Sequence, residues 1–172
     1  MTKRILIATI AGGLILFVWG FVAWMVLPMH MSSIHSLTNE PQVVSALRGA
    51  TTVPGVYFFS SGLLIYTPGI GMTPSAAQLV RSLIFDLLSA LAVAWLLSRT
   101  AAMSFAQRVL FVAIAGGVMA SLIVDMNNWN WFSFPADFTI GTILDHLVGW
   151  VLAGLALAAL IKPRATTTLA AA

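Results

Sequence analysis

The feature that most constrains this chain is an apolar run without a single charged residue, which extends from Ile5 to Leu27. A helix needs about 20 apolar residues to cross the hydrocarbon of a bilayer, which is roughly 30 Å thick. The run meets that length, and it exceeds the apolar region of a cleavable secretory signal, which has about 7–15 residues. It therefore predicts a transmembrane helix that stays in the protein.

Three further apolar segments predict three more transmembrane helices, over residues 74–98, 105–126 and 138–161. The composition agrees, because 60% of the residues are hydrophobic and 8% are charged, whereas soluble domains have about 45–50% and 25%. We expect an all-α transmembrane fold, a four-helix up-down bundle in which residues 1–172 form a single membrane domain. Residues 162–172 follow the last helix as a cytoplasmic tail.

Residues that start or stop helices mark the ends of these segments. Pro28 follows the first helix, and Ser104 directly precedes the third. Thr73 is expected to be the N-cap of the second helix, with Pro74 in its first turn, and Asp137 the N-cap of the fourth. These boundaries leave one long connection, between the first and second helices.

That long connection, residues 28–73, predicts a small folded unit of its own. The segment Asn39–Pro41 can open a short helix that runs through Arg48. Two runs of aromatic and aliphatic residues then flank residues 60–62, a pattern typical of a β-hairpin. We expect a small extracytoplasmic cap, made of the short helix and the hairpin, and the hairpin should lie on the helix ends or dip into the membrane interface.

The Lys and Arg residues divide unevenly between the two sides of this topology. Cytoplasmic loops of membrane proteins carry an excess of these residues. Arg48 and Arg81 fall on the side of the cap, and the other basic residues fall on the opposite side. We therefore expect a multi-pass protein of the cell (inner) membrane with both termini in the cytoplasm. The basic residues of the cytoplasmic side are Lys3, Arg4, Arg99, Arg108, Lys162 and Arg164.

Several titratable side chains fall inside the predicted helices, in their outer halves. At 1.5 Å per residue, Asp86 lies about 18 Å below the outer end of its helix and Asp145 about 11 Å. An ionised group at the bilayer centre costs about 2.5–3.5 kcal/mol on insertion scales, so these groups should be neutral, paired or hydrated. The membrane-embedded polar cluster comprises Arg81, Asp86, Asp125, Asp145 and His146.

Small residues recur at four-residue spacing around each aspartate of this cluster. That spacing places residues on one side of a helix, and small residues let helices approach closely. We therefore expect the aspartates to point into the bundle and not at lipid. The three faces are Ser82, Asp86, Ala90 and Ala94; Ala113, Gly117, Ser121 and Asp125; and Gly141, Asp145, Gly149 and Ala153.

Several interpretations of the polar cluster stay open. In a structural one, Arg81 pairs with Asp145 or Asp125, or extends its guanidinium to the interface. In a functional one, the cluster forms an ion or proton path, or an outward-facing pocket for an amphiphile or a lipid headgroup, closed below Asp86. A weaker metal hypothesis uses imidazole ligands, and its histidines are His30, His35 and His146.

Tryptophans near the predicted helix ends are expected at the level of the lipid headgroups. Amphipathic indole rings concentrate there in membrane proteins. Trp24 lies near the end of the first helix, and Trp129 and Trp131 lie in residues 127–132, which we expect to form the second external loop.

Several classes of chemistry are excluded by what the sequence lacks. It contains no Cys, which excludes disulfides, thiolate metal sites and thiol redox chemistry. It has no G-x-S-x-G elbow, no H-E-x-x-H motif and no glycine-rich phosphate loop, so no catalytic residue and no cofactor is predicted. A net charge of +3 spread along the chain forms no patch for nucleic acid.

Two functions of different class are consistent with these features. The first is a non-enzymatic accessory or binding subunit that contacts a partner protein or lipid through its cap and small-residue helix faces. The second is a small ion-, proton- or metal-linked transporter or channel-like protein that uses the Asp/His cluster. A polar path from Asp86 to the cytoplasm would favour the second, and a dry inner half would favour the first. The expected partners are the lipid bilayer and either further copies of the chain or a larger membrane complex.

Overall fold

The computed structural model describes residues 2–51, 53–60, 62–66, 73–100 and 103–162, and it is mostly helical. Four helices in this part of the chain are long and apolar enough to cross a membrane. The prediction of four such helices and a small two-stranded sheet is confirmed. The helices are α1 (Thr2–Phe21) with its π-helical continuation η1 (Val22–Val26), α3 (Ala76–Arg99), the third long helix (Phe105–Phe132) and α6 (Ala136–Leu160).

The third long helix changes its winding along its length. It begins as α4 (Phe105–Val112), passes through two π-helical segments and ends as α5 (Met126–Phe132). The π-helical segments are η3 (Ala113–Val118) and η4 (Ser121–Asp125). Hydrogen bonds in a π-helical turn join residues five apart instead of four. Such turns are rare overall, but many of those known lie at functional sites.

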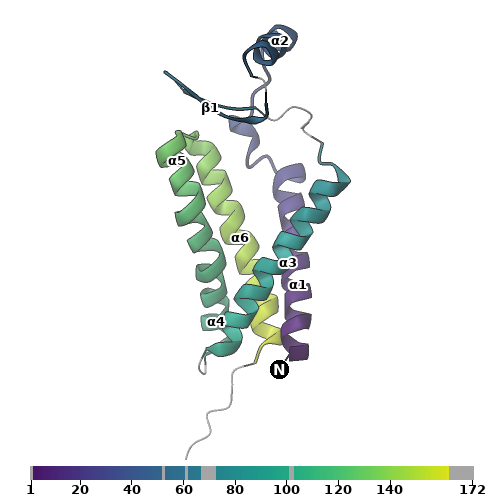
Figure 1. Ribbon diagram of the computed structural model, residues 1–172. Helices are drawn as coiled ribbons and strands as arrows, with labels where there is room; N and C mark the ends of the chain where they lie inside the picture. The colour runs from purple at the N-terminus through teal and green to yellow at the C-terminus, as the bar shows by residue number, and fades with distance from the viewer. Residues whose placement is uncertain (1, 52, 61, 67–72, 101–102, 163–172) are drawn as a thin grey trace, which may run out of the picture.

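A small cap joins α1 to α3, as the sequence predicts. It contains the short 3₁₀ helix η2 (Met31–Ser33), α2 (Glu40–Ala50) and the strands β1 (Gly55–Phe59) and β2 (Gly62–Tyr66). The strands pair antiparallel, with Val56 opposite Ile65. Figure 1 shows α2 and the hairpin beyond one end of the long helices. We call that end the cap end and the opposite one the far end.

The long helices pack most closely in the half near the far end. α1 lies against both α3 and α6, and α6 also packs against α4 and η3 (Figure 1). The apolar core there includes Leu97 of α3, Val112 of α4 and Leu157 of α6, none of them more than 2% exposed. Ala8, Ala94 and Ala153 are fully buried among them. Small side chains therefore let the helix backbones approach each other in this half.

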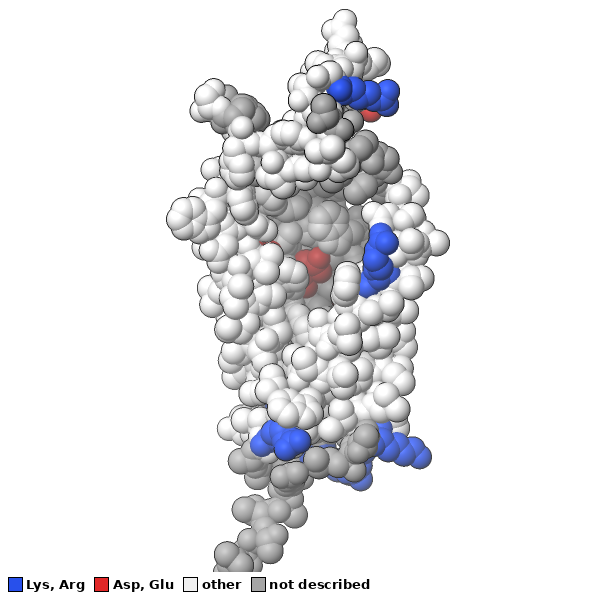
Figure 2. All heavy atoms as spheres, in the orientation of Figure 1, with Lys and Arg blue, Asp and Glu red and all other residues white. Residues whose placement is uncertain are grey.

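Basic side chains gather at the far end, as Figure 2 shows. Nη1 of Arg108 donates a hydrogen bond to the backbone oxygen of Ala158 at 2.6 Å and a second one to that of Ile161. The guanidinium therefore caps the last carbonyls of α6, where a positive charge also complements the helix dipole. Arg164, which the sequence analysis assigns to the same side, lies outside the described residues.

Two predicted helix starts are wrong by a few residues. α3 has Ser75 as its N-cap instead of Thr73, because Ser75 and Gln78 form reciprocal side chain to backbone hydrogen bonds of 2.8 and 3.3 Å. α6 has Pro135 at the N-cap position instead of Asp137. Asp137 lies in the first turn, where its negative charge interacts favourably with the positive end of the helix dipole.

The predicted second external loop, residues 127–132, is helical instead. The side-chain amide of Asn127 donates to the backbone oxygen of Ile123 at 2.9 Å, so it bonds within the helix and not to a turn. The helix ends at Ser133, whose φ of 53° is left-handed. The connection to α6 is therefore only a few residues long, which makes these two helices antiparallel neighbours.

Candidate functional site

A cavity of about 940 Å³ separates the long helices in the half near the cap. All four contribute to its walls, for example with Trp24 of η1, Leu79 of α3, Ile123 of η4 and Trp150 of α6. α3 meets the third long helix mainly at α4 and η3, so the two diverge toward the cap end. Figure 2 shows the resulting hollow on the side of the molecule, with acidic atoms visible inside it. The cavity thus opens sideways, between helices.

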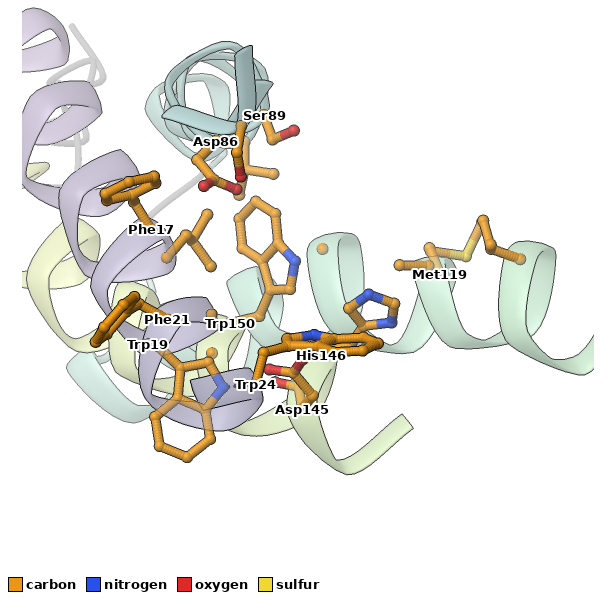
Figure 3. A pocket seen from close by; sticks show the side chains of 18 of the residues that line it. Phe17, Trp19, Phe21, Trp24, Asp86, Ser89, Met119, Asp145, His146 and Trp150 are labelled. Carbon is orange, nitrogen blue, oxygen red and sulfur yellow. Dashed lines mark hydrogen bonds between the residues drawn. The ribbon is translucent and has the colours of Figure 1, made fainter. Parts of the chain in front are cut away.

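Most of the cavity wall is apolar, and its charged side chains are carboxylates. Asp86 of α3 and Asp145 of α6 line it together with His146, and Figure 3 shows these side chains approaching from their two helices. Among the lining residues that the structure describes there is no Lys or Arg. The cavity therefore combines an apolar surface with acidic groups and no fixed cation of the Lys or Arg type.

The three π-helical segments of the long helices all contribute to this cavity. η1 supplies Trp24 and Met25, η3 supplies Gly116, and η4 supplies Ile123 and Val124. π-helical turns inside longer helices are frequently found at functional sites. The irregular winding in α1 and in the third long helix therefore coincides with the hollow part of the molecule.

Two tryptophans of the cavity wall are held in place by glycines on facing helices. A Cβ atom on Gly149 would lie 2.8 Å from Cδ1 of Trp19, and one on Gly116 would lie 2.1 Å from Cδ2 of Trp150. Only glycine leaves room for either ring. Nε1 of Trp19 also donates a hydrogen bond to the backbone oxygen of Asp145 at 3.0 Å, which joins α1 to α6 beside the carboxylate.

His30, in the segment after η1, lies beside Asp145 and is almost completely buried, with 1% of its surface exposed. Its ring stacks on Trp24 at a centroid distance of 3.9 Å and meets the edge of Phe138. Nε2 of His30 lies 3.8 Å from Oδ2 of Asp145, too far for a hydrogen bond. Neither ring nitrogen has a hydrogen-bond partner among the described residues. In the described part of the chain, His30 is the one basic group within 4 Å of Asp145.

His146 belongs to a second acid–histidine pair. Its Nδ1 lies 2.8 Å from Oδ2 of Asp125, a hydrogen bond in which the ring N–H donates to the carboxylate. Asp125 is buried, whereas 37% of the His146 side chain is exposed. Because Nδ1 is occupied, Nε2 is the ring nitrogen available to a molecule in the cavity.

The Asp125–His146 pair is not among the predicted contacts, although the sequence contains a signal for it. Asp125 and His146 lie at nearly equal distances on either side of Pro135, so a tight connection there places them at the same level of two antiparallel helices. Depth measured from the predicted helix ends does not reveal the pair, because the third helix continues to Phe132, beyond its predicted end.

One interpretation of the sequence pairs Arg81 with Asp145 or Asp125, and the other extends its guanidinium to the membrane interface. Arg81 is exposed and, among the described residues, no carboxylate oxygen lies within 4 Å of it. The predicted ion pairs with Asp145 and Asp125 are therefore wrong, and histidines take both positions. A long arginine side chain can extend away from the helix, whereas an aspartate cannot.

The metal hypothesis also fails on geometry. His30 and His146 each pair with a different aspartate, and His35 is exposed on the segment after η2. No three His, Asp or Glu side chains of the described chain come close enough together to hold a metal ion.

The small-residue faces around Asp125 and Asp145 are buried along their whole length. On α3, Ala90 and Ala94 are buried, whereas Ser82 is exposed and lines the cavity with Asp86. The cavity also reaches past Asp86 to Ser89 and Val93, so its predicted closure below Asp86 is wrong. The cavity is deeper than predicted because α3 leans away from η4 instead of packing against it.

The predicted interface tryptophans differ in their surroundings. Trp129 and Trp131 are exposed at the end of α5. Trp24 is 41% exposed, but it also stacks on His30 and lines the cavity. Trp24 therefore belongs to the candidate site as well as to the helix end.

Comparisons of this chain with protein-family models, with curated proteins and with solved structures find no match. The residues of the cavity are therefore the evidence for its function. They can hold an apolar molecule against indole and aliphatic side chains, and they can place carboxylates and one imidazole nitrogen next to its polar part.

Proposed function

We propose that the protein is a non-enzymatic, multi-pass membrane protein that holds an amphiphilic molecule in the cavity between its helices. The length and apolar character of the four helices support membrane insertion. Large exposed side chains on their outer faces, such as Leu6, Val18, Phe85 and Leu152, support it too, because lipid is the solvent that suits them. In this proposal the four helices form an up-down bundle in the cell (inner) membrane.

Both termini are then in the cytoplasm, and the cap lies outside. This orientation is supported by the basic side chains that gather at the far end (Figure 2). Lys3 at the start of α1, Arg99 at the end of α3 and Arg108 in α4 are examples. With the far end inside, the cavity lies in the outer half of the membrane. Its side opening then faces the outer leaflet, so an amphiphile can enter from lipid without crossing an aqueous phase.

The observation that carries this proposal is the cavity itself. Its volume of about 940 Å³ lies near the upper end of the range for small-molecule sites, about 300–1,000 Å³. Mostly apolar walls with a few convergent polar groups are typical of such sites. Here the titratable groups are Asp86, Asp145 and His146, which come from two helices, and Gln78, Ser82 and Ser89 of α3 add uncharged polar groups.

The packing below the cavity supports binding over conduction. From its floor at Val93 and Trp150 to the far end, the helices meet through the apolar core that includes Leu97 and Leu157. A channel or a proton path would need polar groups or space for water through this layer. The accessory or binding function is therefore favoured over the transporter alternative. In this role the cap is the part that can reach a partner protein outside the membrane.

The test is to fill the cavity from a position where a larger side chain fits. Gly20 lines the cavity, and a Cβ atom built on it meets nothing within 4 Å. Wild-type protein and the Gly20→Leu variant are purified gently in native lipid and examined by native mass spectrometry. We expect a tightly retained amphiphile on the wild type and a clear loss of it from Gly20→Leu.

Gly49→Leu is the matched control, because Gly49 lies in α2 of the cap and its Cβ also meets nothing within 4 Å. It should retain the amphiphile like the wild type. Equal retention by wild type and Gly20→Leu, or no retained molecule on either, would contradict the proposed function.

A further inference from the structure

We propose that the molecule held in this cavity is an organic cation: an ammonium group attached to an apolar chain. Its charge would lie between Asp86 and Asp145, and its chain would lie along the apolar wall. This inference rests on the proposed function, because it names the chemical class of the amphiphile that the same cavity binds.

The charges of the cavity wall are the first argument. The lining residues include two carboxylates and, among the described residues, no Lys or Arg. In the described chain, no basic group lies within 4 Å of Asp86. The one basic group near Asp145 is His30, whose Nε2 lies 3.8 Å from Oδ2 and makes no hydrogen bond. Unlike charges attract much more strongly in a medium of low polarity than in water. A cation is therefore the ligand that the two carboxylates favour, and an anion is repelled.

The aromatic side chains of the cavity wall also favour a cation, and they do so independently of the carboxylates. Trp19, Trp24 and Trp150 all line the cavity, together with Phe17 and Phe21. Figure 3 shows Asp86 and Trp150 at one part of the cavity, and Asp145 and Trp24 at another. The faces of indole rings attract cations within about 6 Å, and groups of aromatic rings are a recurrent site for quaternary ammonium ions. Each carboxylate thus has an indole in the same cavity.

The apolar remainder of the wall requires that the cation carries an apolar body. Leu16, Leu79, Ile123 and Val124 line the cavity, and they would gain nothing from a small hydrated ion. Met25 and Met119 add flexible, polarisable side chains that adapt to ligands of different shape. An inorganic divalent ion prefers several oxygen ligands, and the described chain offers no cluster of three suitable side chains.

An ammonium group can come from a free amphiphilic amine or from a zwitterionic lipid headgroup. The headgroup also carries a phosphate, for which the described cavity wall has no Lys or Arg partner. Arg81 is exposed and is not part of the lining. We therefore expect the free amine to bind more tightly than the zwitterion, and both to bind more tightly than an anion.

The experiment uses the full chain in nanodiscs of a neutral glycolipid, which contains neither ammonium nor phosphate. The probe is a hexadecyl quaternary ammonium with a nitroxide at its head, which quenches the fluorescence of nearby tryptophans. Hexadecyltrimethylammonium, hexadecylphosphocholine and hexadecyl sulfate, which share one chain, then compete with the probe. Empty nanodiscs correct for partitioning into lipid.

For the wild type we expect saturable quenching and displacement by hexadecyltrimethylammonium at a concentration at least about tenfold lower than by hexadecyl sulfate. Asp86→Asn and Asp145→Asn should each weaken probe binding by about three- to tenfold. A quaternary ammonium cannot lose a proton, so this loss reports on charge. Asp137→Asn is the matched control, because Asp137 lies in α6, is exposed and does not line the cavity.

The outcomes separate the two proposals. If the three competitors displace the probe equally and the Asp86 and Asp145 variants bind normally, while Gly20→Leu weakens binding of all amphiphiles, the cation inference is overturned and the amphiphile cavity stands. If quenching never exceeds that of empty nanodiscs, or if Gly20→Leu binds like Gly49→Leu, both proposals are overturned. Equal displacement by the phosphocholine and the trimethylammonium compound, with weak displacement by the sulfate, supports ammonium recognition and identifies a lipid headgroup as the source.

Discussion

The half of the helices near the far end and the half near the cap are built from the same four helices, yet they differ in packing and in chemistry. In the far half, small residues and glycines bring the backbones together around Leu97, Val112 and Leu157. In the cap half, the helices diverge, η1 and η4 wind as π-helix, and the carboxylates and histidines lie around a cavity. The same four helices therefore form a packed core at one end and a cavity at the other.

The same residue type has opposite consequences in the two halves. Gly13 of α1 faces α3 so closely that a Cβ there would lie 2.9 Å from Cα of Leu87. Gly20, two turns further along the same helix, faces open space. Packing is therefore not a property of α1 as a whole, and mutations can probe its two halves separately.

The largest effect is expected at Gly13. Gly13→Ala forces a methyl group against the backbone of Leu87, which cannot move aside as a flexible side chain would. Overpacking of this kind should lower the free energy of unfolding by about 2–3 kcal/mol. Gly20→Ala should leave that free energy unchanged or raise it, because alanine favours a helix more than glycine does. Unfolding in mixed micelles of increasing SDS content, followed by circular dichroism, measures both. A loss of equal size in the two variants would remove the distinction between the halves.

An intermediate effect is expected at the far end, where Arg108 caps α6. Arg108→Met removes the hydrogen bonds to the carbonyl oxygens of Ala158 and Ile161. It should lower the free energy of unfolding by about 2 kcal/mol, because bonds from a charged donor are the stronger ones.

Arg99→Met is the comparison for this variant. The guanidinium of Arg99 lies over the ring of Trp95 at 5.0 Å, and such a contact is worth about 0.5–1 kcal/mol at an exposed site. The same SDS titration measures both variants. If Arg99→Met destabilises the protein as much as Arg108→Met, the capping of α6 is not what holds the far end.

The smallest effect is expected for the Asp125–His146 pair in the cap half. A double-mutant cycle with Asp125→Ala and His146→Ala should give a coupling energy of about 1 kcal/mol, since polar contacts between membrane helices are modest. Asp125→Ala combined with His30→Ala should give a coupling near zero, because no hydrogen bond or ion pair joins these two residues in the described chain. A larger coupling in the second cycle than in the first would contradict the pairing.

What the sequence could predict follows from interactions that are local along the chain. The apolar run Ile5–Leu27 gives the first long helix, and the aromatic runs around residues 60–62 give the hairpin. Ser104 starts the third helix as predicted, because the capping box with Gln107 lies within one turn. Capping choices between close candidates, such as Thr73 and Ser75, depend on which side chain finds a reciprocal partner.

The candidate site could be predicted only in part, because it depends on which helices are neighbours. Depth along each helix correctly groups Asp86, Asp145 and His146 in one region. Depth does not show which side chains are partners. Arg81 is therefore one predicted partner of Asp145 and Asp125, whereas His30 and His146 lie beside these aspartates in the structure. No residue pattern in the sequence predicts the π-helical segments. The sideways opening of the cavity could not be predicted either, because it follows from the divergence of α3 and the third long helix.

The most direct test of the central claim is a cryo-electron microscopy structure of the full chain in lipid nanodiscs made from the membrane in which it is produced. We predict that α3 and η4 stay apart, and that elongated density unconnected to the protein fills the space between Trp24, Trp150 and Ile123, with one end at Asp86 and Asp145. A structure in which α3 packs against η4 and the carboxylates face each other across no gap would contradict the account.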